Sequence, residues 1–302
     1  MTTTALPDTA AAGDEAVYGE PPKRRDTWKQ VRAYFGLALI VIWGLAPFYW
    51  MIVTAFRQVG YTFETTLWPT HPTFDNFRTA FDTSRGNHLA QALGNSLIIG
   101  VVTTLVAMVA GVFASYALAR LSFPFKYGIL GIILGASMFP VVALVSPLFS
   151  LFSNIGWLTG ANYQALIIPD ISFALPLTVY TLTAFLGELP WDLEEAARID
   201  GATPGQAFRK VMLPLAVPGL FTTAILAFIS SWNEYLLAQQ FSTSKTQPVT
   251  VAIAGFTGAL PHVEPYTTIM AAGTVVTVPL IIMVLIFQRA IVSGLTAGGV
   301  KG

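Results

Sequence analysis

Long stretches without charge divide the chain into six hydrophobic segments. Roughly 20 apolar residues cross the hydrocarbon core of a bilayer, and a charge at the centre of such a segment is costly. Residues 127–169 contain no charge, but they exceed one crossing and include the turn-prone run 154–162, so we divide them into two spans. We therefore predict an all-α integral membrane protein with six transmembrane helices. The predicted spans are residues 33–56, 92–118, 127–153, 164–186, 217–241 and 267–288.

Composition supports a membrane protein and excludes several other classes. Of the 302 residues, 54% are hydrophobic and 11% are charged, whereas about 25% of the residues in a soluble domain are charged. The net charge of +0 gives no sign of nucleic-acid binding. The absence of cysteine excludes disulfides, thiolate catalysis and cysteine-ligated zinc. The histidines, His71, His88 and His262, lie far apart in polar stretches, so we expect no metal site.

Lysine and arginine fall unevenly on the two sides of the predicted spans, and this asymmetry predicts the orientation. Only Arg57, Arg78, Arg85 and Lys245 lie on one side. The other side, which we predict to be cytoplasmic, carries Lys23, Arg24, Arg25, Lys29, Arg32, Arg120, Lys126, Arg198, Arg209, Lys210, Arg289 and Lys301. Both termini are then cytoplasmic in a multi-pass protein of the plasma (inner) membrane.

The chain is expected to have three parts. Residues 1–30 are polar and lack an apolar core, so we expect a disordered cytoplasmic tail rather than a signal peptide. Residues 31–290 form the transmembrane domain, which includes a long inner loop at residues 187–216. Residues 291–302 form a cytoplasmic C-terminal tail.

The inner loop is predicted to contain two helices joined by a tight turn. Asp192 is placed to cap the first helix, with Glu195 three residues later as in a capping box. Gly201 ends this helix, because glycine adopts the left-handed conformation that a tight stop prefers. Thr203 caps the second helix, and Pro214 ends it.

Small side chains at Ala196 and Ala197 would let the backbone of a partner approach the first helix closely. Two interpretations follow from these residues. The loop is either a docking element, or an ordinary interfacial loop whose basic residues obey the positive-inside rule.

Particular residues of this loop and of the C-terminus resemble a known family. Glu195-Ala196-Ala197, Gly201 and Leu213-Pro214 resemble the EAA loop of ATP-binding-cassette importer permeases, with Val211 where isoleucine is usual. The end of the chain, residues 294–302, resembles the ending of MalG-type sugar permeases, with Gly299 replacing alanine. Further matches are Asp200-Gly201-Ala202, Leu213-Pro214-Leu215 with Pro218, and Trp232-Asn233-Glu234. The resemblance extends from about residue 33 to the end and is strongest to actinobacterial permeases for trehalose-like or maltose-like disaccharides.

This resemblance implies a type I (MetI-like) ABC importer permease domain and a set of partners. They are a second, MalF-like permease subunit, two ATP-binding-cassette ATPase subunits and an extracytoplasmic sugar-binding protein, expected to be a lipoprotein. ATP and Mg²⁺ would be bound by the ATPase, so this chain would hold no cofactor and would not itself be an enzyme. The residues implied to couple to the ATPase are Glu194, Glu195, Ala196, Ala197, Asp200, Gly201, Leu213 and Pro214. In the C-terminal tail, an extended segment would contact the ATPase through Gly294, Leu295, Thr296, Gly298 and Lys301.

The sequence reveals no motif that would supply energy for transport within this chain. It has no Gly-x-x-x-x-Gly-Lys-Ser/Thr phosphate loop. An ion-coupled carrier normally places ionisable residues near the midplane, and the candidates here are Asp170 and Glu234. Each lies about 10 Å below the outer end of its predicted span, at ~1.5 Å per residue. Their similar depth suggests one cavity that opens outwards.

The fifth span is unusually rich in hydrogen-bonding side chains. Aromatic faces next to hydrogen-bonding groups are suited to binding a sugar, so we predict that this part of the fifth span lies on the substrate pathway. Prolines 169 and 176 are expected to break the fourth span. The alternatives are that these polar groups satisfy each other or bond to the neighbouring subunit, and that Asp170 caps a helical segment. The pathway residues are Asp170, Trp232, Asn233, Glu234 and Tyr235.

The sequence therefore predicts the permease subunit of an ATP-driven, binding-protein-dependent sugar importer, for a disaccharide such as trehalose or maltose. An alternative is a permease of the same superfamily for a non-sugar solute such as glycerol phosphate, which would need basic residues in its cavity. A second alternative is a secondary carrier driven by an ion gradient.

Overall fold

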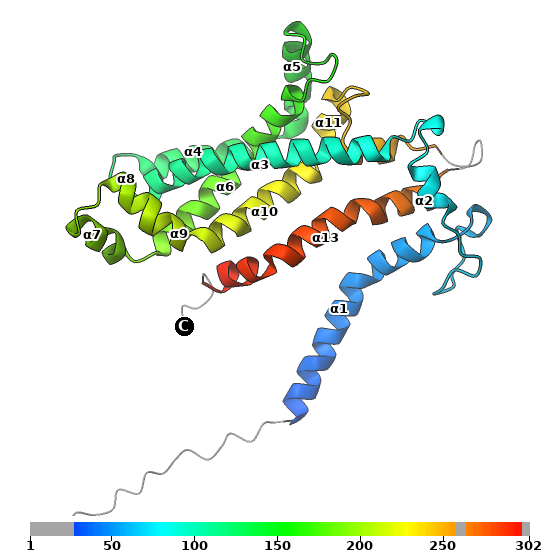
Figure 1. Ribbon diagram of the computed structural model, residues 1–302, viewed down its shortest axis with the longest axis horizontal. Helices are drawn as coiled ribbons and strands as arrows, with labels where there is room; N and C mark the ends of the chain where they lie inside the picture. The colour runs from blue at the N-terminus through cyan, green and yellow to red at the C-terminus, as the bar shows by residue number, and fades with distance from the viewer. Residues whose placement is uncertain (1–26, 258–263, 298–302) are drawn as a thin grey trace, which may run out of the picture. The chain divides into compact units, whose positions relative to one another are not determined.

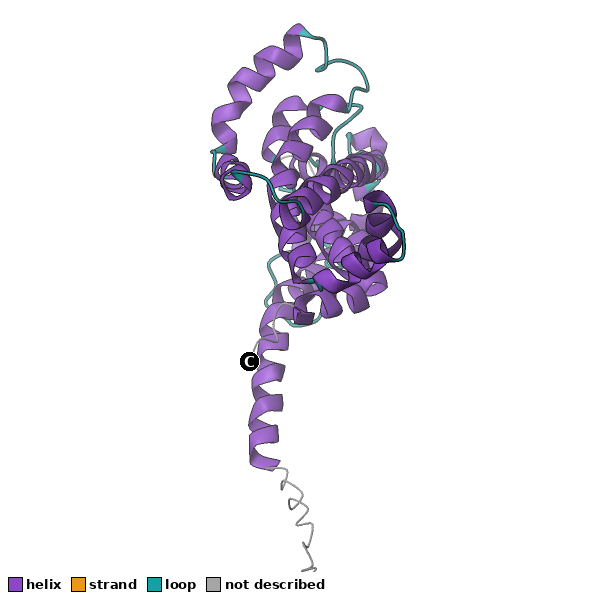
Figure 2. Cartoon of the chain, turned by 90° about the vertical axis from the view of Figure 1, so that its left-hand side faces the viewer, coloured by secondary structure: helices purple, strands orange, loops and turns teal. Residues whose placement is uncertain are grey.

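The computed structural model describes residues 27–257 and 264–297, with side chains described in residues 28–257 and 264–288. Regular structure in these ranges is helical, apart from an isolated bridge between Arg57 and Pro72 (Figure 2). The α-helices are α1 (Thr27–Ala55), α2 (Asp75–Ala80), α3 (Leu89–Arg120), α4 (Lys126–Ser137), α5 (Val141–Asn154), α6 (Gln164–Glu188), α7 (Trp191–Ile199), α8 (Pro204–Ala207), α9 (Leu213–Leu215), α10 (Val217–Trp232), α11 (Leu236–Phe241), α12 (Val249–Ala254) and α13 (Tyr266–Ala297). Short helical segments of other types are η1 (Val59–Tyr61), η2 (Thr83–Arg85) and η3 (Phe208–Met212), the last a π-helix.

Four of these helices, α1, α3, α6 and α13, are long and apolar enough to cross a membrane. Two bent helix pairs bring the number to as many as six spans, so the prediction of an all-helical membrane protein is confirmed. The chain divides into two units, residues 1–47 and residues 48–302. In the first unit, the described part of α1 exposes large apolar side chains such as Trp43, which is 85% exposed.

The second unit is built around α3, α6, α10 and α13, which pack against one another (Figure 1). Close helix contacts are possible because glycines face bulky side chains. A Cβ at Gly219 would lie 2.5 Å from Cγ of Phe185, and a Cβ at Gly111 would lie 2.5 Å from Cγ2 of Thr178. Between apolar helices in lipid, such tight packing replaces the hydrophobic effect as the main source of association.

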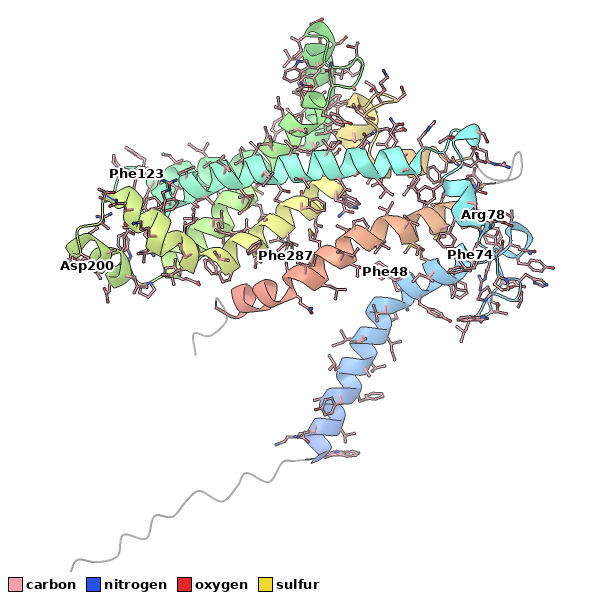
Figure 3. The ribbon with its side chains drawn as sticks, viewed as in Figure 1. Phe48, Phe74, Arg78, Phe123, Asp200 and Phe287 are labelled. Carbon is pink, nitrogen blue, oxygen red and sulfur yellow. The ribbon has the colours of Figure 1, made fainter. Side chains whose placement is uncertain are left out.

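The two ends of this bundle carry different elements. We call them the α7 end, which carries α7 and α8, and the α2 end, which carries α2 and η2. Asp200 lies at the tip between α7 and α8, and Arg78 lies in α2 at the opposite end (Figure 3).

The third predicted span, residues 127–153, is not one straight helix. Helices α4 and α5 meet at an angle of 84°. Pro140 stands directly before α5, and the residue before a proline is pushed away from the helical conformation. Helices α4 and α5 have 12 and 14 residues, so neither alone reaches across a hydrocarbon core of ~30 Å.

The predicted break in the fourth span is wrong, and an interruption lies in the fifth span instead. Helix α6 runs without a break through Pro169 and Pro176. In membrane helices, prolines are tolerated inside a continuous helix because neighbouring groups adjust to them. The predicted fifth span, residues 217–241, is divided at residues 233–235 into α10 and α11.

The C-terminal prediction is also corrected in part. Helix α13 continues to Ala297, so Gly294, Leu295 and Thr296 belong to a helix and not to an extended tail. Helix propagation gains one hydrogen bond for each residue added, which favours continuing an apolar helix through an isolated glycine. Gly298 and Lys301 lie outside the described residues, as do residues 1–26 of the predicted N-terminal tail.

Candidate functional site

The first helix of the inner loop, α7, begins two residues earlier than a capping box at Asp192 requires. Its N-cap is Pro190, which offers no side-chain cap, so the predicted Asp192–Glu195 capping box is wrong. Asp192 lies instead in the first turn, where its negative charge interacts favourably with the positive end of the helix dipole.

The end of α7 is formed as predicted. Gly201 has φ +89°, the left-handed conformation that glycine adopts without penalty. The amide of Gly201 donates to the carbonyl of Arg198, and the amide of Ala202 donates to the carbonyl of Ala197, each at 3.0 Å. These two bonds form a Schellman motif, which fixes the direction in which the chain leaves α7.

The second helix of the loop begins with the predicted cap. Thr203 Oγ1 accepts from the amide of Gln206, and Gln206 Oε1 accepts from the amide of Thr203. The prediction that Pro214 ends this helix is wrong, because α8 continues through η3 and α9 to Leu215. Pro214 lies inside this continuous run, one residue before its end. The chain then turns by 72° into α10.

Glu194 anchors α7 to the body of the protein. The residue is 2% exposed, and its Oε1 accepts from the hydroxyl of Tyr116 at 2.9 Å and from Arg198 Nη2 at 2.7 Å. Tyr116 belongs to α3, so a partly buried, charge-assisted hydrogen bond joins two elements that are far apart in sequence.

Arg120, at the end of α3, joins the same region to α6. The guanidinium Nη2 donates to the carbonyls of Leu186 and Leu189, each at 2.7 Å, and so satisfies acceptors at the end of α6. Its Cζ lies 4.7 Å from the ring centroid of Trp191, the first residue of α7. Arg120 is 5% exposed, although the sequence reasoning counted it only as a loop charge.

The outer face of α7 remains uncovered. Glu195 and Ala196 are exposed, and Ile199, three residues beyond Ala196, is 81% exposed. Trp191 and Leu193 of α7 are also exposed, and a group of exposed large apolar side chains is typical of a contact surface. Of the eight residues expected to couple to a partner, only Glu194 is buried. Exposed are Glu195, Ala196, Asp200, Gly201 and Pro214, and half-buried are Ala197 and Leu213.

A pair of carboxylates lies between α6 and the break in the fifth span. Asp170, six residues into α6, is 7% exposed and accepts from Ser231 Oγ at 2.5 Å. Glu234 accepts from the amides of Leu237 and Ala238, at 2.7 and 2.8 Å, and so caps α11.

Asp170 and Glu234 line one small cavity together with Ser96 of α3. The cavity has a volume of about 10 Å³. That is about the space of one water molecule, so no sugar fits there in this conformation. Asp170 does not cap a helical segment, because α6 is continuous around it.

The other predicted pathway residues point to different surroundings. Trp232 is 2% exposed and stacks on Phe228, with ring centroids 5.4 Å apart, inside the apolar core. Asn233 is exposed and donates to the carbonyl of Ile229 at 2.9 Å. Tyr235 is exposed. Sequence reasoning missed Ser96, whose polarity in an apolar span was the signal that could have revealed it.

No group of three or more histidine, aspartate or glutamate side chains able to hold a metal ion occurs in the described parts of the chain. The candidate sites are therefore the uncovered face of α7, its buried attachment to α3 and α6, and the carboxylate pair at the α10–α11 break.

A family model described as "Binding-protein-dependent transport system inner membrane component" matches residues 83–297, which include all three of these places. The chain belongs to this family. It is therefore a permease subunit of a binding-protein-dependent ABC importer, a multi-pass protein of the inner membrane, and not a catalytic subunit.

Curated relatives resemble the permease over most of its length. It is 49% identical to the trehalose transport system permease protein SugB of Mycobacterium tuberculosis over 87% of this chain and 95% of that protein. It is 38% identical to the trehalose/maltose transport system permease protein MalG of Thermococcus litoralis, over 92% of this chain and 99% of that one. A diacetylchitobiose uptake system permease, DasC of Streptomyces coelicolor, is 34% identical over 88% and 95%.

Solved structures confirm the fold of the permease. A chain of a bacterial ABC transporter involved in import of the acidic polysaccharide alginate matches with a TM-score of 0.67 and 21% identity, covering 88% of this chain and 97% of that one. A chain of the MetNI methionine ABC transporter in an inward-facing conformation matches with a TM-score of 0.51 and 20% identity, covering 70% and 95%. The ABC importer permease fold predicted from the EAA loop is therefore confirmed.

Proposed function

We propose that this permease imports a disaccharide of the trehalose or maltose type. The observation that carries the proposal is the 49% identity, over 87% of the chain, to a permease named for trehalose transport. The other relatives described above are named for trehalose and maltose or for diacetylchitobiose, which are also built from two sugar units. The mixture of aromatic and hydrogen-bonding side chains near residues 230–235 supports the same class of substrate.

The uncovered face of α7 is proposed to dock on an ATPase subunit. Glu195, Ala196 and Ile199 give this face one charge, one small side chain and one apolar side chain, all exposed. The Schellman turn at Gly201 holds the face in a fixed direction. ATP and Mg²⁺ would be bound by the ATPase, and residues from Gly294 to Lys301 would extend the contact.

This docking gives the α7 end a cytoplasmic location, with both termini on the same side, as the distribution of basic residues predicts. The α2 end would then face the extracytoplasmic sugar-binding protein. A second, MalF-like permease subunit would complete the membrane part of the importer.

The break between α10 and α11 is proposed to lie on the substrate pathway. Asn233 and Tyr235 are exposed there, and Glu234 lies between them. The cavity beside Glu234 and Asp170 is too small for a sugar, so this conformation would keep the pathway closed at that level. Trp232 would support the break from the core rather than touch the sugar, because its ring is buried.

The decisive experiment is reconstitution of the permease with its partner permease, ATPases and binding protein in liposomes. Trehalose and maltose, each loaded on the binding protein, are expected to stimulate ATP hydrolysis and to accumulate inside. Glycerol phosphate is the matched non-sugar solute, and dissipation of ion gradients separates an ATP-driven importer from a secondary carrier. The proposal would be overturned if the sugars accumulated along an ion gradient without ATP. It would also be overturned if glycerol phosphate accumulated and the sugars did not.

The pathway has a test of its own. Asn233→Ala and Glu234→Ala are expected to lower sugar uptake, while the assembly of the two permease subunits with the two ATPase subunits still forms. Normal affinity and rate in both variants would remove the α10–α11 break from the pathway.

A further inference from the structure

Two side chains of α3 hold the inner loop by its buried side. Tyr116 and Arg120 are four residues apart, so they share one face of α3. Tyr116 bonds to Glu194 of α7 at 2.9 Å. Arg120 bonds to the carbonyls at the end of α6 and stacks on Trp191.

Tyr116 also contacts the second helix of the loop. Its ring centroid lies 4.6 Å from that of Phe208, the first residue of η3. Phe208 is buried and also lies 6.1 Å from Phe113, one turn earlier on α3. Both helices of the inner loop are therefore attached to the same two turns of α3.

The attachment has unused hydrogen-bonding capacity. Glu194 Oε2, Arg120 Nε and Arg120 Nη1 are buried and have no partner among the described residues. A buried polar atom without a partner is unfavourable, so these atoms do not contribute to holding α7. The bonds that Tyr116 and Arg120 do make, to Glu194 and to the end of α6, therefore carry the attachment.

Helix α3 connects this attachment to the carboxylate pair. It is an unbroken helix of 32 residues without proline, and Ser96, which lines the Asp170–Glu234 cavity, belongs to it. Ser96 and Tyr116 are 20 positions apart in sequence, which corresponds to roughly 30 Å along the helix. At the cavity, Ser96 Oγ accepts from the amide of Val249 at 2.9 Å, so α3 is also held there.

We propose that Tyr116 and Arg120 are positioning residues that transmit movement of α7 through α3 and α6 to the cavity at Asp170 and Glu234. The inference rests on the proposed docking of α7 on an ATPase, and it adds the path by which that docking acts. A displacement of α7 would otherwise be absorbed by the short connections on either side of it. Because Glu194 of α7 and the end of α6 are both bonded to α3, the three helices shift together. Packed helices of this kind move as units between two discrete arrangements.

The first test measures coupling in the reconstituted importer. Tyr116→Phe removes only the hydroxyl that bonds to Glu194, and Arg120→Lys keeps the charge but loses the planar group that reaches two carbonyls and stacks on Trp191. We expect ATP hydrolysis to continue in both, while sugar imported per ATP falls about tenfold in Arg120→Lys and severalfold in Tyr116→Phe. Tyr127→Phe, which alters a tyrosine that is 79% exposed, is the matched control and should couple normally.

A double-mutant cycle tests whether Tyr116 acts through Glu194. If it does, Tyr116→Phe combined with Glu194→Ala, which removes both acceptor oxygens, lowers sugar imported per ATP no more than Glu194→Ala alone. Additive losses would overturn the path through this bond. This cycle also keeps the proposal testable if Arg120→Lys fails to assemble.

A second readout does not depend on which solute is transported. The chain has no cysteine, so Leu97→Cys, at a position that is 42% exposed beside Ser96, supplies one label that reports on α3 in an assembly with cysteine-free partners. ATP and Mg²⁺ are expected to change its labelling rate in the otherwise unaltered chain but not in Arg120→Lys or Tyr116→Phe. If ATP and Mg²⁺ changed the labelling rate equally in the unaltered chain and in both variants, the proposed linkage would be overturned. The proposal of sugar import would not be affected. A response in the unaltered chain without sugar uptake would instead overturn the proposed substrate and support the linkage.

Discussion

The bundle buries carboxylates in two places, and the groups that surround them differ. At the α7 end, Glu194 is paired with Arg198, and Arg120 lies nearby against α6 and Trp191. At the α10–α11 break, the described partners of Asp170 and Glu234 are a serine hydroxyl and backbone amides, without a basic side chain.

This difference separates a fixed attachment from a region that can rearrange. The Glu194 carboxylate is buried and held by Arg198 and Tyr116, so a specific geometry is favoured, because removing a partner leaves a buried charge with less compensation. Neutral donors are easily exchanged for water when a cavity widens. The α7 end thus suits transmission of force, whereas the α10–α11 break suits opening and closing around a neutral, hydroxyl-rich substrate.

The largest effect is expected at the uncovered face of α7. Glu195→Lys together with Gly201→Asp reverses a charge on that face and adds a side chain at the turn, where φ is +89°. We expect sugar uptake to fall about 100-fold, equivalent to ~2.7 kcal/mol of lost coupling. Uptake and stimulated ATP hydrolysis in the reconstituted importer measure this, and normal values for both would show that the face does not dock.

A smaller effect is expected where Glu234 caps α11. Glu234→Gln keeps one acceptor but loses the second carboxylate oxygen, so one of the two capping bonds to α11 is lost. Loss of a helix cap costs about 1 kcal/mol, and we expect sugar uptake to slow about fivefold on that basis.

Asp170→Asn is the matched comparison at this site. Its amide oxygen can still accept from Ser231, so we expect a smaller loss than in Glu234→Gln. Equal, severe losses in the two variants would mean that the carboxylate charges themselves are required, and the contrast with the α7 end would fail.

Sequence reasoning predicted the fold class, the left-handed helix stop at Gly201 and the cap at Thr203, because each depends on local residue chemistry. It did not locate the breaks in the spans. Pro140 interrupts one span, whereas Pro169 and Pro176 leave another intact, and only packing against neighbouring helices decides between these outcomes.

The candidate site was predicted unevenly for a related reason. The exposed residues of α7 carry a recognisable local pattern, so they were found. Tyr116 and Arg120 carry none, because their role depends on the carbonyls and the carboxylate of helices about 70 residues away in sequence. A lone arginine at the end of a span is ordinary under the positive-inside rule, and burial alone distinguishes this one.

The smallest effect tests whether packing is tighter at the α7 end. A Cβ at Gly219 would lie 2.5, 2.6 and 2.7 Å from three ring atoms of Phe185, whereas a Cβ at Gly100, toward the α10–α11 break, would lie 2.8, 3.2 and 3.4 Å from ring atoms of Phe228. Overpacking a well-packed site costs about 1–3 kcal/mol, so Gly219→Ala should lower the thermal unfolding midpoint of the assembled importer by a few degrees. We expect Gly100→Ala to lower it less, because the Phe228 ring needs a smaller shift.

Gly205→Ala is the control for both variants, since a Cβ there meets nothing within 4 Å. It should leave the midpoint unchanged. If Gly100→Ala proved more destabilising than Gly219→Ala, the α10–α11 break would be the more rigidly packed of the two regions. Another part of the substrate pathway would then have to be the one that opens, because tightly packed interiors resist the small displacements that opening requires.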